Sequence, residues 1–265
     1  GESNLAHKKI CLDRWGHYKK VLFVEGKDEK YLSKLASISG YCNLFDGEIT
    51  IIPIGGFSQW ERILHAEWAF SGVLGENILI GALLDRDYRC SEHINEFCEK
   101  LKKQISLSHV LARKEIENYL LIPSALDLTI KARLKVRHSL GKIPAIPDFT
   151  IEDILTEVTE KFKEQVFGQM VSNEIVYFHS KGLDTATIAA GSLKSFESKW
   201  KDLKQRLAIV PGKAVMSALN EYLQDKWGIS ITPGQICNYI DKSQIDSDLI
   251  TFFEKLKKFR DSVAV

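Results

Sequence analysis

The sequence has no large excess of charge of either sign and no long hydrophobic run. Its 36 Lys and Arg residues nearly balance 35 Asp and Glu residues, for a formal net charge of +1, which excludes a histone-like polycation and an acidic tail protein. The longest apolar run near the middle of the chain, residues 78–84, is far too short to cross a bilayer. Because 45% of the residues are hydrophobic, we expect a globular chain rather than a disordered, collagen-like or membrane-embedded one.

Cysteine is scarce, and no Cys-x-x-Cys pair occurs. The five cysteines are Cys11, Cys42, Cys90, Cys98 and Cys237. Scattered thiols in odd number are typical of a reducing compartment, and no charged segment followed by an apolar one marks a secretory leader. We therefore predict a cytoplasmic location. Cys90, His93 and Cys98 fall near one helical face, but without a second cluster they are too few for a zinc site.

Short apolar segments alternate with helical patterns over the first 120 residues. The predicted strands cover residues 20–24, 49–54, 77–84 and 107–111. Nearly every position in them is apolar, as expected of strands that are covered on both faces. The alternation predicts an α/β fold with a mostly parallel sheet and helices on both of its faces.

The pattern changes after Pro123, where helical periodicity with many Lys and Glu residues replaces the strand signal. Predicted helices cover residues 151–167, 193–207, 213–227 and 245–259, with one more starting near residue 232 and a loop at residues 141–147. This organisation predicts three parts: a catalytic core at 1–123, a helical insertion at 124–210, and a helical segment at 211–265 that completes the core region.

Acidic residues follow three of the predicted strands. Glu25 follows the first, Asp85 and Asp87 follow the third, and Glu117 comes after the fourth, while Glu29 lies in the first turn of the helix after the first strand. In parallel sheets ligands collect at the carboxyl ends of the strands, and carboxylates that lie together repel unless a cation neutralises them. Carboxylate oxygens suit Mg²⁺, and two ions about 4 Å apart can activate water and stabilise a leaving oxygen in phosphodiester cleavage.

Each acid has a structural explanation when it is taken singly. An Asp after a strand is a common turn or N-cap residue, and a Glu in the first turn of a helix complements the helix dipole. The occurrence of acids at three strand ends together favours a metal site over these separate explanations.

Two of these acidic motifs resemble the Toprim fold, the metal-dependent catalytic domain shared by topoisomerases, primases and certain nucleases. They are Val-Leu-Phe-Val-Glu-Gly at 21–26 and Leu-Leu-Asp-Arg-Asp at 83–87. The phrase Arg-Lys-Glu-Ile-Glu-Asn-Tyr-Leu-Leu at 113–121 is similar to the Toprim version found at the C-terminal end of OLD-family (overcoming lysogenization defect) endonucleases and in related anti-phage effectors. Residues 210–215, Val-Pro-Gly-Lys-Ala-Val, more weakly resemble a segment of that family with an essential lysine.

The resemblance implies a DNA endonuclease that uses two Mg²⁺ or Mn²⁺ ions, with Glu25, Asp85 and Lys213 as catalytic residues. Glu25 would bind one ion together with the carboxylate four residues later, where the family usually has Asp and this chain has Glu29. Asp28 remains an alternative to Glu29. Lys213 would stabilise negative charge on the phosphate or the leaving oxygen. The alternative for Lys213 is a solvated lysine after a Pro-Gly turn.

The remaining ligands follow from the same resemblance. Asp85 would bind or bridge the first ion, and Asp87 would serve the second. Glu117 matches the family's later acid because it directly precedes Asn-Tyr-Leu. Glu115 remains an alternative to it.

Basic residues close to the acidic motifs are predicted to bind DNA phosphates, which gives affinity without sequence preference. They are Lys27, Arg86, Arg89, Arg113 and Lys114. The Gly-x-x-x-x-Gly-Lys-[Ser/Thr] loop of ATPases is absent, so no ATP site is predicted here. An OLD-type protein would then need an ATPase domain or partner chain in addition to these residues.

Two other functions compete with the nuclease. The first is a catalytically inactive Toprim module that binds nucleic acid or an ATPase partner. The second is a phosphotransfer enzyme with an Asp-x-Asp nucleophile, which would need its first Asp after the first strand, where this chain has Glu25.

Overall fold

The computed structural model describes residues 20–26, 29–55, 60–68 and 78–262 of the chain. Its contacts divide the chain into two compact units. Unit 1 comprises residues 1–85, 95–110 and 247–265, and unit 2 comprises residues 86–94 and 111–246. The three-part organisation predicted from the sequence is a different division of the chain, and it stays a prediction.

Unit 1 contains a four-stranded, all-parallel sheet in the order β2-β1-β3-β4. Its strands are β1 (Lys20–Val24), β2 (Thr50–Pro53), β3 (Leu79–Leu84) and β4 (Leu107–Val110). Its helices are α2 (Glu29–Ile38), α3 (Glu61–Trp68) and α12 (Ser247–Asp261), and α4 (Ser91–Leu101) begins in unit 2 and ends in unit 1. The predicted α/β fold class and all four predicted strands are confirmed.

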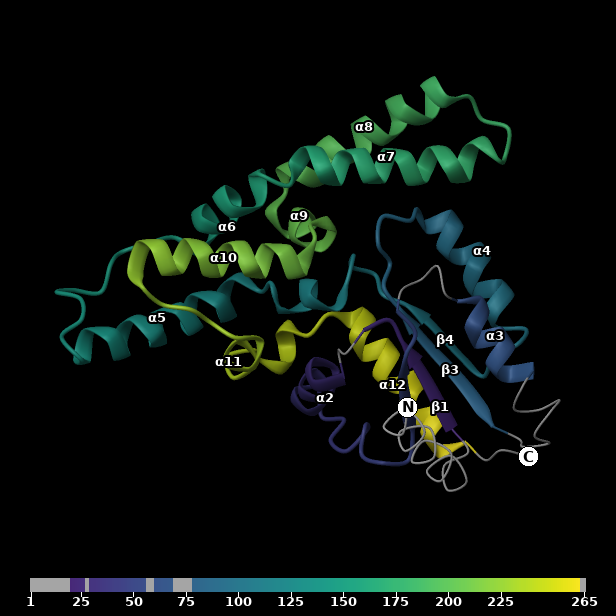
Figure 1. Ribbon diagram of the computed structural model, residues 1–265, viewed down its shortest axis with the longest axis horizontal. Coiled ribbons are helices and arrows are strands. Elements are labelled where there is room, and N and C mark those ends of the chain that lie inside the picture. Colours follow the sequence, from purple (N-terminus) through teal and green to yellow (C-terminus); the bar gives the residue numbers. More distant parts are fainter. Residues whose placement is uncertain (1–19, 27–28, 56–59, 69–77, 263–265) are drawn as a thin grey trace, which may run out of the picture. The chain divides into compact units, whose positions relative to one another are not determined.

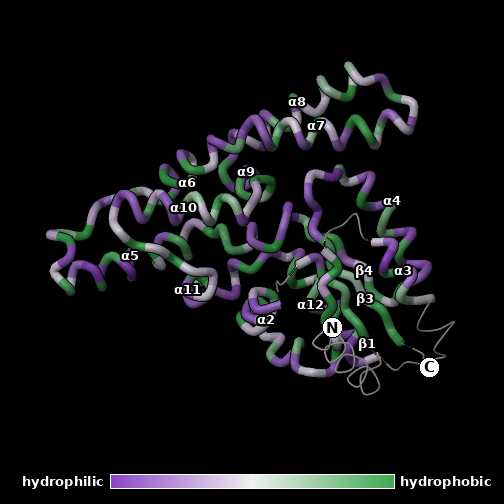
Figure 2. The backbone as a smooth tube through the Cα atoms, viewed as in Figure 1, coloured by the Kyte–Doolittle hydropathy of each residue, from purple (hydrophilic) through white to green (hydrophobic). Residues whose placement is uncertain are grey.

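The two central strands form the core of unit 1. Residues 21–24 of β1 and 80–84 of β3 are buried, and Figure 2 shows these strands as continuously hydrophobic. Gly81 pairs with Leu22 on one side and Leu107 on the other, and a Cβ at Gly81 would lie 3.2 Å and 3.3 Å from their side chains. The close approach of three strands at this point explains a glycine inside a buried strand.

The strand order places the helices on both faces of the sheet. The chain moves from β1 to the edge strand β2 and then back across β1 to β3 and β4. Right-handed crossovers therefore put α2 on one face and α3 and α4 on the other, as Figure 1 shows. Trp60 and Phe97 are in edge-to-face contact beside α3 and α4, and Tyr41 contacts Phe253 of α12 beside α2. Helices on both faces, as predicted, are confirmed.

Within the described residues, unit 2 contains helices and no strand. Its helices are α5 (Pro123–Ser139), α6 (Ile151–Glu160), α7 (Lys163–His179), α8 (Thr185–Lys201), α9 (Leu203–Ile209), α10 (Gly212–Trp227) and α11 (Pro233–Cys237), with the 3₁₀ segments η3 (Ile116–Leu120) and η4 (Lys242–Gln244).

Two predicted helices were wrong in their extent. The predicted helix at 151–167 is interrupted at Lys161 and Phe162, between α6 and α7. The predicted helix at 193–207 is divided at Asp202, whose carboxylate accepts a hydrogen bond from the amide of Gln205 at 2.9 Å and caps α9. Periodicity alone did not reveal this cap, because Asp is also tolerated on an exposed helix face.

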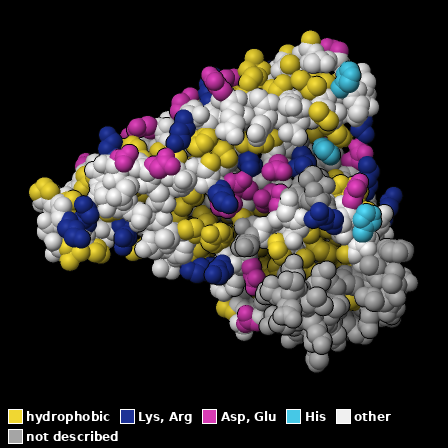
Figure 3. Space-filling model, viewed as in Figure 1, with side chains coloured by type: hydrophobic (Ala, Val, Ile, Leu, Met, Phe, Trp, Pro, Cys, Tyr) yellow, Lys and Arg dark blue, Asp and Glu magenta, His cyan; other side chains and the backbone are white. Residues whose placement is uncertain are grey.

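Three further findings bear on the sequence predictions. Within the described residues, no helix is long and apolar enough to span a membrane. Cys42, Cys90 and Cys98 are free thiols. Lys and Arg side chains are interspersed with Asp and Glu on the face in Figure 3, in keeping with the near-zero net charge. Cys11 lies outside the described residues.

Candidate functional site

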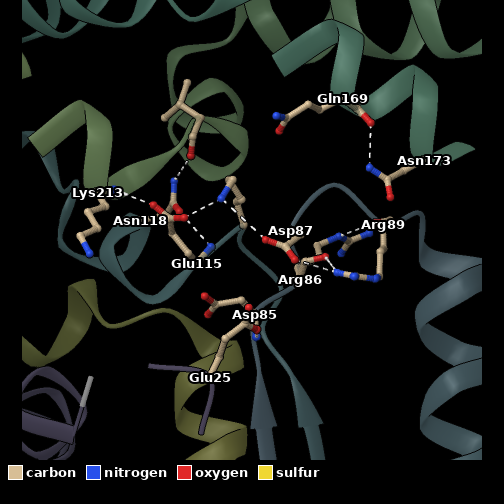
Figure 4. Close-up of polar contacts among 12 residues, drawn as sticks. Glu25, Asp85, Arg86, Asp87, Arg89, Glu115, Asn118, Gln169, Asn173 and Lys213 are labelled. Carbon is tan, nitrogen blue, oxygen red and sulfur yellow. Dashed lines mark hydrogen bonds and ion pairs between the residues drawn. The ribbon is translucent and has the colours of Figure 1, made fainter. Parts of the chain in front are cut away.

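The first pair of predicted metal ligands lies together in unit 1. Glu25 follows β1 and Asp85 follows β3, and these strands are neighbours, with Val24 beside Leu83. The Glu25 carboxylate oxygen Oε2 accepts a hydrogen bond from the backbone amide of Asp85 at 3.0 Å, and both residues are half-buried. Figure 4 shows the two side chains next to each other. Their juxtaposition is as predicted from the strand ends.

The pair also lies where the chain reverses its direction of travel across the sheet. From β1 the chain goes to β2 on one side, and the next strand, β3, lies on the other side of β1. Open parallel sheets bind ligands at this switch point, outside the carboxyl ends of the two strands. Glu25 and Asp85 are the first residues after those two ends.

Asp87 belongs to unit 2 and lies between basic groups there. Its carboxylate is 2.9 Å from the Arg89 guanidinium and 3.8 Å from the Lys114 ammonium. Its backbone has φ of 51°, a left-handed conformation that Asp tolerates better than most residues, and its amide donates to the Lys114 carbonyl at 2.9 Å. The predicted ligand of a second ion is thus already neutralised by two of the predicted DNA-binding residues.

Two other predicted DNA-binding side chains also make internal contacts. Arg113 reaches the Asp246 carboxylate through two nitrogens, at 3.1 and 3.0 Å, and the Asn118 carbonyl at 2.8 Å. Arg86 donates to the Arg89 carbonyl at 3.1 Å and to the Ser91 hydroxyl at 2.9 Å. These contacts fix the loops around Asp87, whereas phosphate binding by either arginine stays a prediction.

The segment at 115–118 packs closely against the start of α10 and is held there by hydrogen bonds. The Asn118 side chain is fully buried and donates to the carbonyls of Leu207 and Val210, both at 2.8 Å, while its oxygen accepts from the Glu115 amide at 3.0 Å. A Cβ at Gly212 would lie 2.8 Å from the Asn118 amide nitrogen. Only glycine therefore allows this close approach of α10 to η3.

The same contact between residues 115–118 and the start of α10 brings Glu115 to Lys213. The Glu115 carboxylate accepts from the Lys213 amide at 2.6 Å and pairs with the Lys114 ammonium at 2.5 Å, as Figure 4 shows for Glu115 and Lys213. The Lys213 side chain is exposed. Sequence reasoning preferred Glu117 to Glu115, and the structure shows that Glu115 is the acid in contact with Lys213.

The other predicted site residues take separate positions. Glu117 is half-buried in the first turn of η3, and Glu29 is exposed at the first position of α2. Lys27 and Asp28 lie outside the described residues. Sequence reasoning missed Asn118 and Gly212. In the structure Glu115 and Asn118 form the reciprocal contacts of a capping box at η3, but Glu-x-x-Asn lacks the Ser or Thr and the Glu or Gln of the usual sequence signature.

The donors of unit 1 fit a hard divalent cation. Mg²⁺ is bound in proteins through one or two carboxylates and retains several waters, and Glu25 with Asp85 supplies two carboxylates. Searched over the described residues alone, the structure contains no group of three or more His, Cys, Asp or Glu side chains arranged to hold a metal ion.

No family model, curated protein or solved structure matches this chain. The resemblance to the Toprim fold and to OLD-family nucleases accordingly rests on the motifs at 21–26, 83–87, 113–121 and 210–215.

Proposed function

We propose that the chain is the catalytic part of a DNA endonuclease that depends on Mg²⁺ or Mn²⁺, of the OLD type or a related anti-phage effector. The observation that carries the proposal is the pairing of Glu25 and Asp85 at the switch point of the parallel sheet. Acids at this position, outside the carboxyl ends of two adjacent strands, are placed where α/β folds bind ligands. DNA, an ATPase domain or chain, and a cytoplasmic setting are parts of the same proposal.

In the proposed mechanism, Glu25 and Asp85 hold the divalent ion. When bound, the ion stabilises charge on the scissile phosphate and lowers the pKa of an attacking water. The Asp85 amide, by donating to Glu25, keeps the Glu25 carboxylate at the strand end. The resemblance assigns Lys213 to the phosphate, and within unit 2 the contact between its amide and Glu115 fixes its backbone in the first turn of α10. Asp87 and Glu117 remain the proposed ligands of the second ion.

The proposal is tested by nicking of supercoiled plasmid DNA with Mg²⁺ or Mn²⁺. Glu25→Gln and Asp85→Asn retain side-chain size and remove the charge, and we expect each to lower the rate at least about 100-fold, because the loss of a metal ligand commonly costs that much. Asp225→Asn, which changes an exposed acid of α10, is the matched control and should nick at the unaltered rate. Equal activity in all three variants would refute the assignment.

The catalytically inactive module is the second candidate, and one observation favours it. Asp87 and Glu115 are already paired with Arg89 and Lys114, so these carboxylates do not require a cation to neutralise them. This function predicts salt-dependent DNA binding without nicking by the unaltered chain at any Mg²⁺ or Mn²⁺ concentration. Metal-dependent nicking that Glu25→Gln abolishes would exclude it.

A further inference from the structure

Unit 2 contains a cavity of about 510 Å³ whose lining includes Asp87 and the basic residues near it but neither Glu25 nor Asp85. Its lining comes from residues 86–92, from Ala112 and Lys114, and from helices α7, α8 and α9. Pockets of about 300–1,000 Å³ accommodate small molecules. The volume is therefore suited to a ligand the size of one nucleotide.

Tyr88 gives this cavity a buried hydrogen-bond donor without a partner. The side chain lines the cavity, Tyr88 is 8% exposed, and its hydroxyl has no hydrogen-bond partner among the described residues. Leaving such a hydroxyl unsatisfied is unfavourable, and a ligand oxygen that accepts its hydrogen bond would relieve this.

The cavity is lined by acidic as well as basic residues, namely Asp87, Glu92 and Glu174 beside Arg86, Arg89, Lys114 and Lys199, and the basic ones differ in how far they are already paired. Arg89 and Lys114 are paired with Asp87. Lys199, from α8, lines the same cavity and is half-buried, and it makes no hydrogen bond or ion pair with another residue in the described part of the chain. Lys199 thus offers a positive charge for an anionic ligand in a partly desolvated position, where charge interactions are stronger than in water.

The rest of the lining suits an aromatic, hydrogen-bonding group. Phe178 and Met170 of α7 provide apolar surface, and aromatic and thioether side chains contact nucleobases favourably. Ser195 and Gln205, from α8 and α9, add a hydroxyl and an amide to the same lining, and these groups can both donate and accept hydrogen bonds.

We propose that this cavity binds a nucleoside 5′-monophosphate, either free or as the terminal nucleotide of a strand, with Lys199 and the Tyr88 hydroxyl donating to the phosphate and Phe178 contacting the base. The site lies entirely in unit 2 and requires neither Glu25 nor Asp85. Its lining includes Asp87, the proposed ligand of the second ion, but binding there does not depend on the Glu25 and Asp85 pair, so either proposal can fail without the other.

Calorimetric titration of the full chain in EDTA, with deoxynucleoside 5′-monophosphates, tests the proposal. We expect Tyr88→Phe to weaken binding about fivefold and Lys199→Met about tenfold or more, the usual effects of losing a neutral and a charged hydrogen bond. Lys201→Met alters an exposed lysine of the same helix and should bind as the unaltered chain does. Inorganic phosphate and the free nucleoside should each bind more weakly than the monophosphate.

Thermal unfolding of Tyr88→Phe provides a second readout. Because the substitution removes a buried hydroxyl without a partner, we expect the melting temperature without ligand to stay the same or rise while nucleotide affinity falls.

No binding of any monophosphate at millimolar concentration, or equal binding by all three variants, would overturn the proposal. A 5′-phosphorylated oligonucleotide is compared with the free monophosphate. Tighter binding of the oligonucleotide would identify the ligand as the end of a strand, and tighter binding of the monophosphate would identify it as a free nucleotide. Unchanged binding in Glu25→Gln, together with loss of nicking, would separate the two sites.

Discussion

At the scale of single residues, Asn118 determines how the segment around Glu115 meets α10. Its amide binds two carbonyls that are 89 and 92 residues away in the sequence, and no local pattern can predict such partners. The positions of Glu25 and Asp85 were predictable, because the end of a buried strand is visible in the sequence and parallel strands end at one edge. The contact between Glu115 and Lys213 spans 98 residues, and it depends on the close packing of Gly212 against Asn118.

Gly212→Ala tests the close approach of Gly212 to Asn118. The added Cβ would lie 2.8 Å from the Asn118 amide nitrogen and 2.9 Å from its side-chain oxygen, so backbone must move, and we expect a loss of about 1–3 kcal/mol in the free energy of unfolding. Gly191→Ala, inside α8 with no atom within 4 Å of the new Cβ, should instead stabilise the chain by up to about 1 kcal/mol. Urea unfolding measures both. Equal stability of Gly212→Ala and the unaltered chain would show that the close approach does not exist.

At the scale of elements, strands were easier to predict than helix ends. Every residue of β3 after Leu79 is buried, and that uniform burial produces an unmistakable apolar run in the sequence. The ends of α6, α8 and α9 depend instead on Arg206, which is 8% exposed. It donates to the Trp200 carbonyl at 2.7 Å, its guanidinium lies 4.8 Å from the Trp200 ring, and it approaches Glu160 to 3.4 Å. An arginine in an amphipathic pattern gives no sign of such a role.

Arg206→Ala should therefore loosen three helix ends together. Loss of a largely buried guanidinium leaves the Trp200 carbonyl without its donor, and we expect the free energy of unfolding to fall by about 2–4 kcal/mol. Lys204→Ala, at an exposed position of the same helix α9, should change it by less than about 0.5 kcal/mol. Chemical denaturation followed by circular dichroism compares the two. Similar losses in both variants would contradict the role given to Arg206.

At the scale of the whole molecule, the sequence predicted the fold class but not the division into compact units. Residues 86–94 belong to unit 2 although they follow directly on β3, and residues 247–265 belong to unit 1 although they come last. Chain segments that join a unit from distant parts of the sequence leave no compositional boundary. The predicted site residues fall accordingly in both units, with Glu25 and Asp85 in unit 1 and Asp87, Glu117 and Lys213 in unit 2.

The central claim is that Glu25 and Asp85 hold a divalent ion at the switch point of the sheet. Anomalous diffraction from crystals soaked in Mn²⁺ tests it most directly. We expect a manganese peak within bonding distance, about 2.0–2.3 Å, of an oxygen from each carboxylate, as hard cations require, and no such peak in Glu25→Gln crystals soaked in the same way. Carboxylates of Glu25 and Asp85 that point apart at saturating Mn²⁺, with no anomalous density between them, would contradict it.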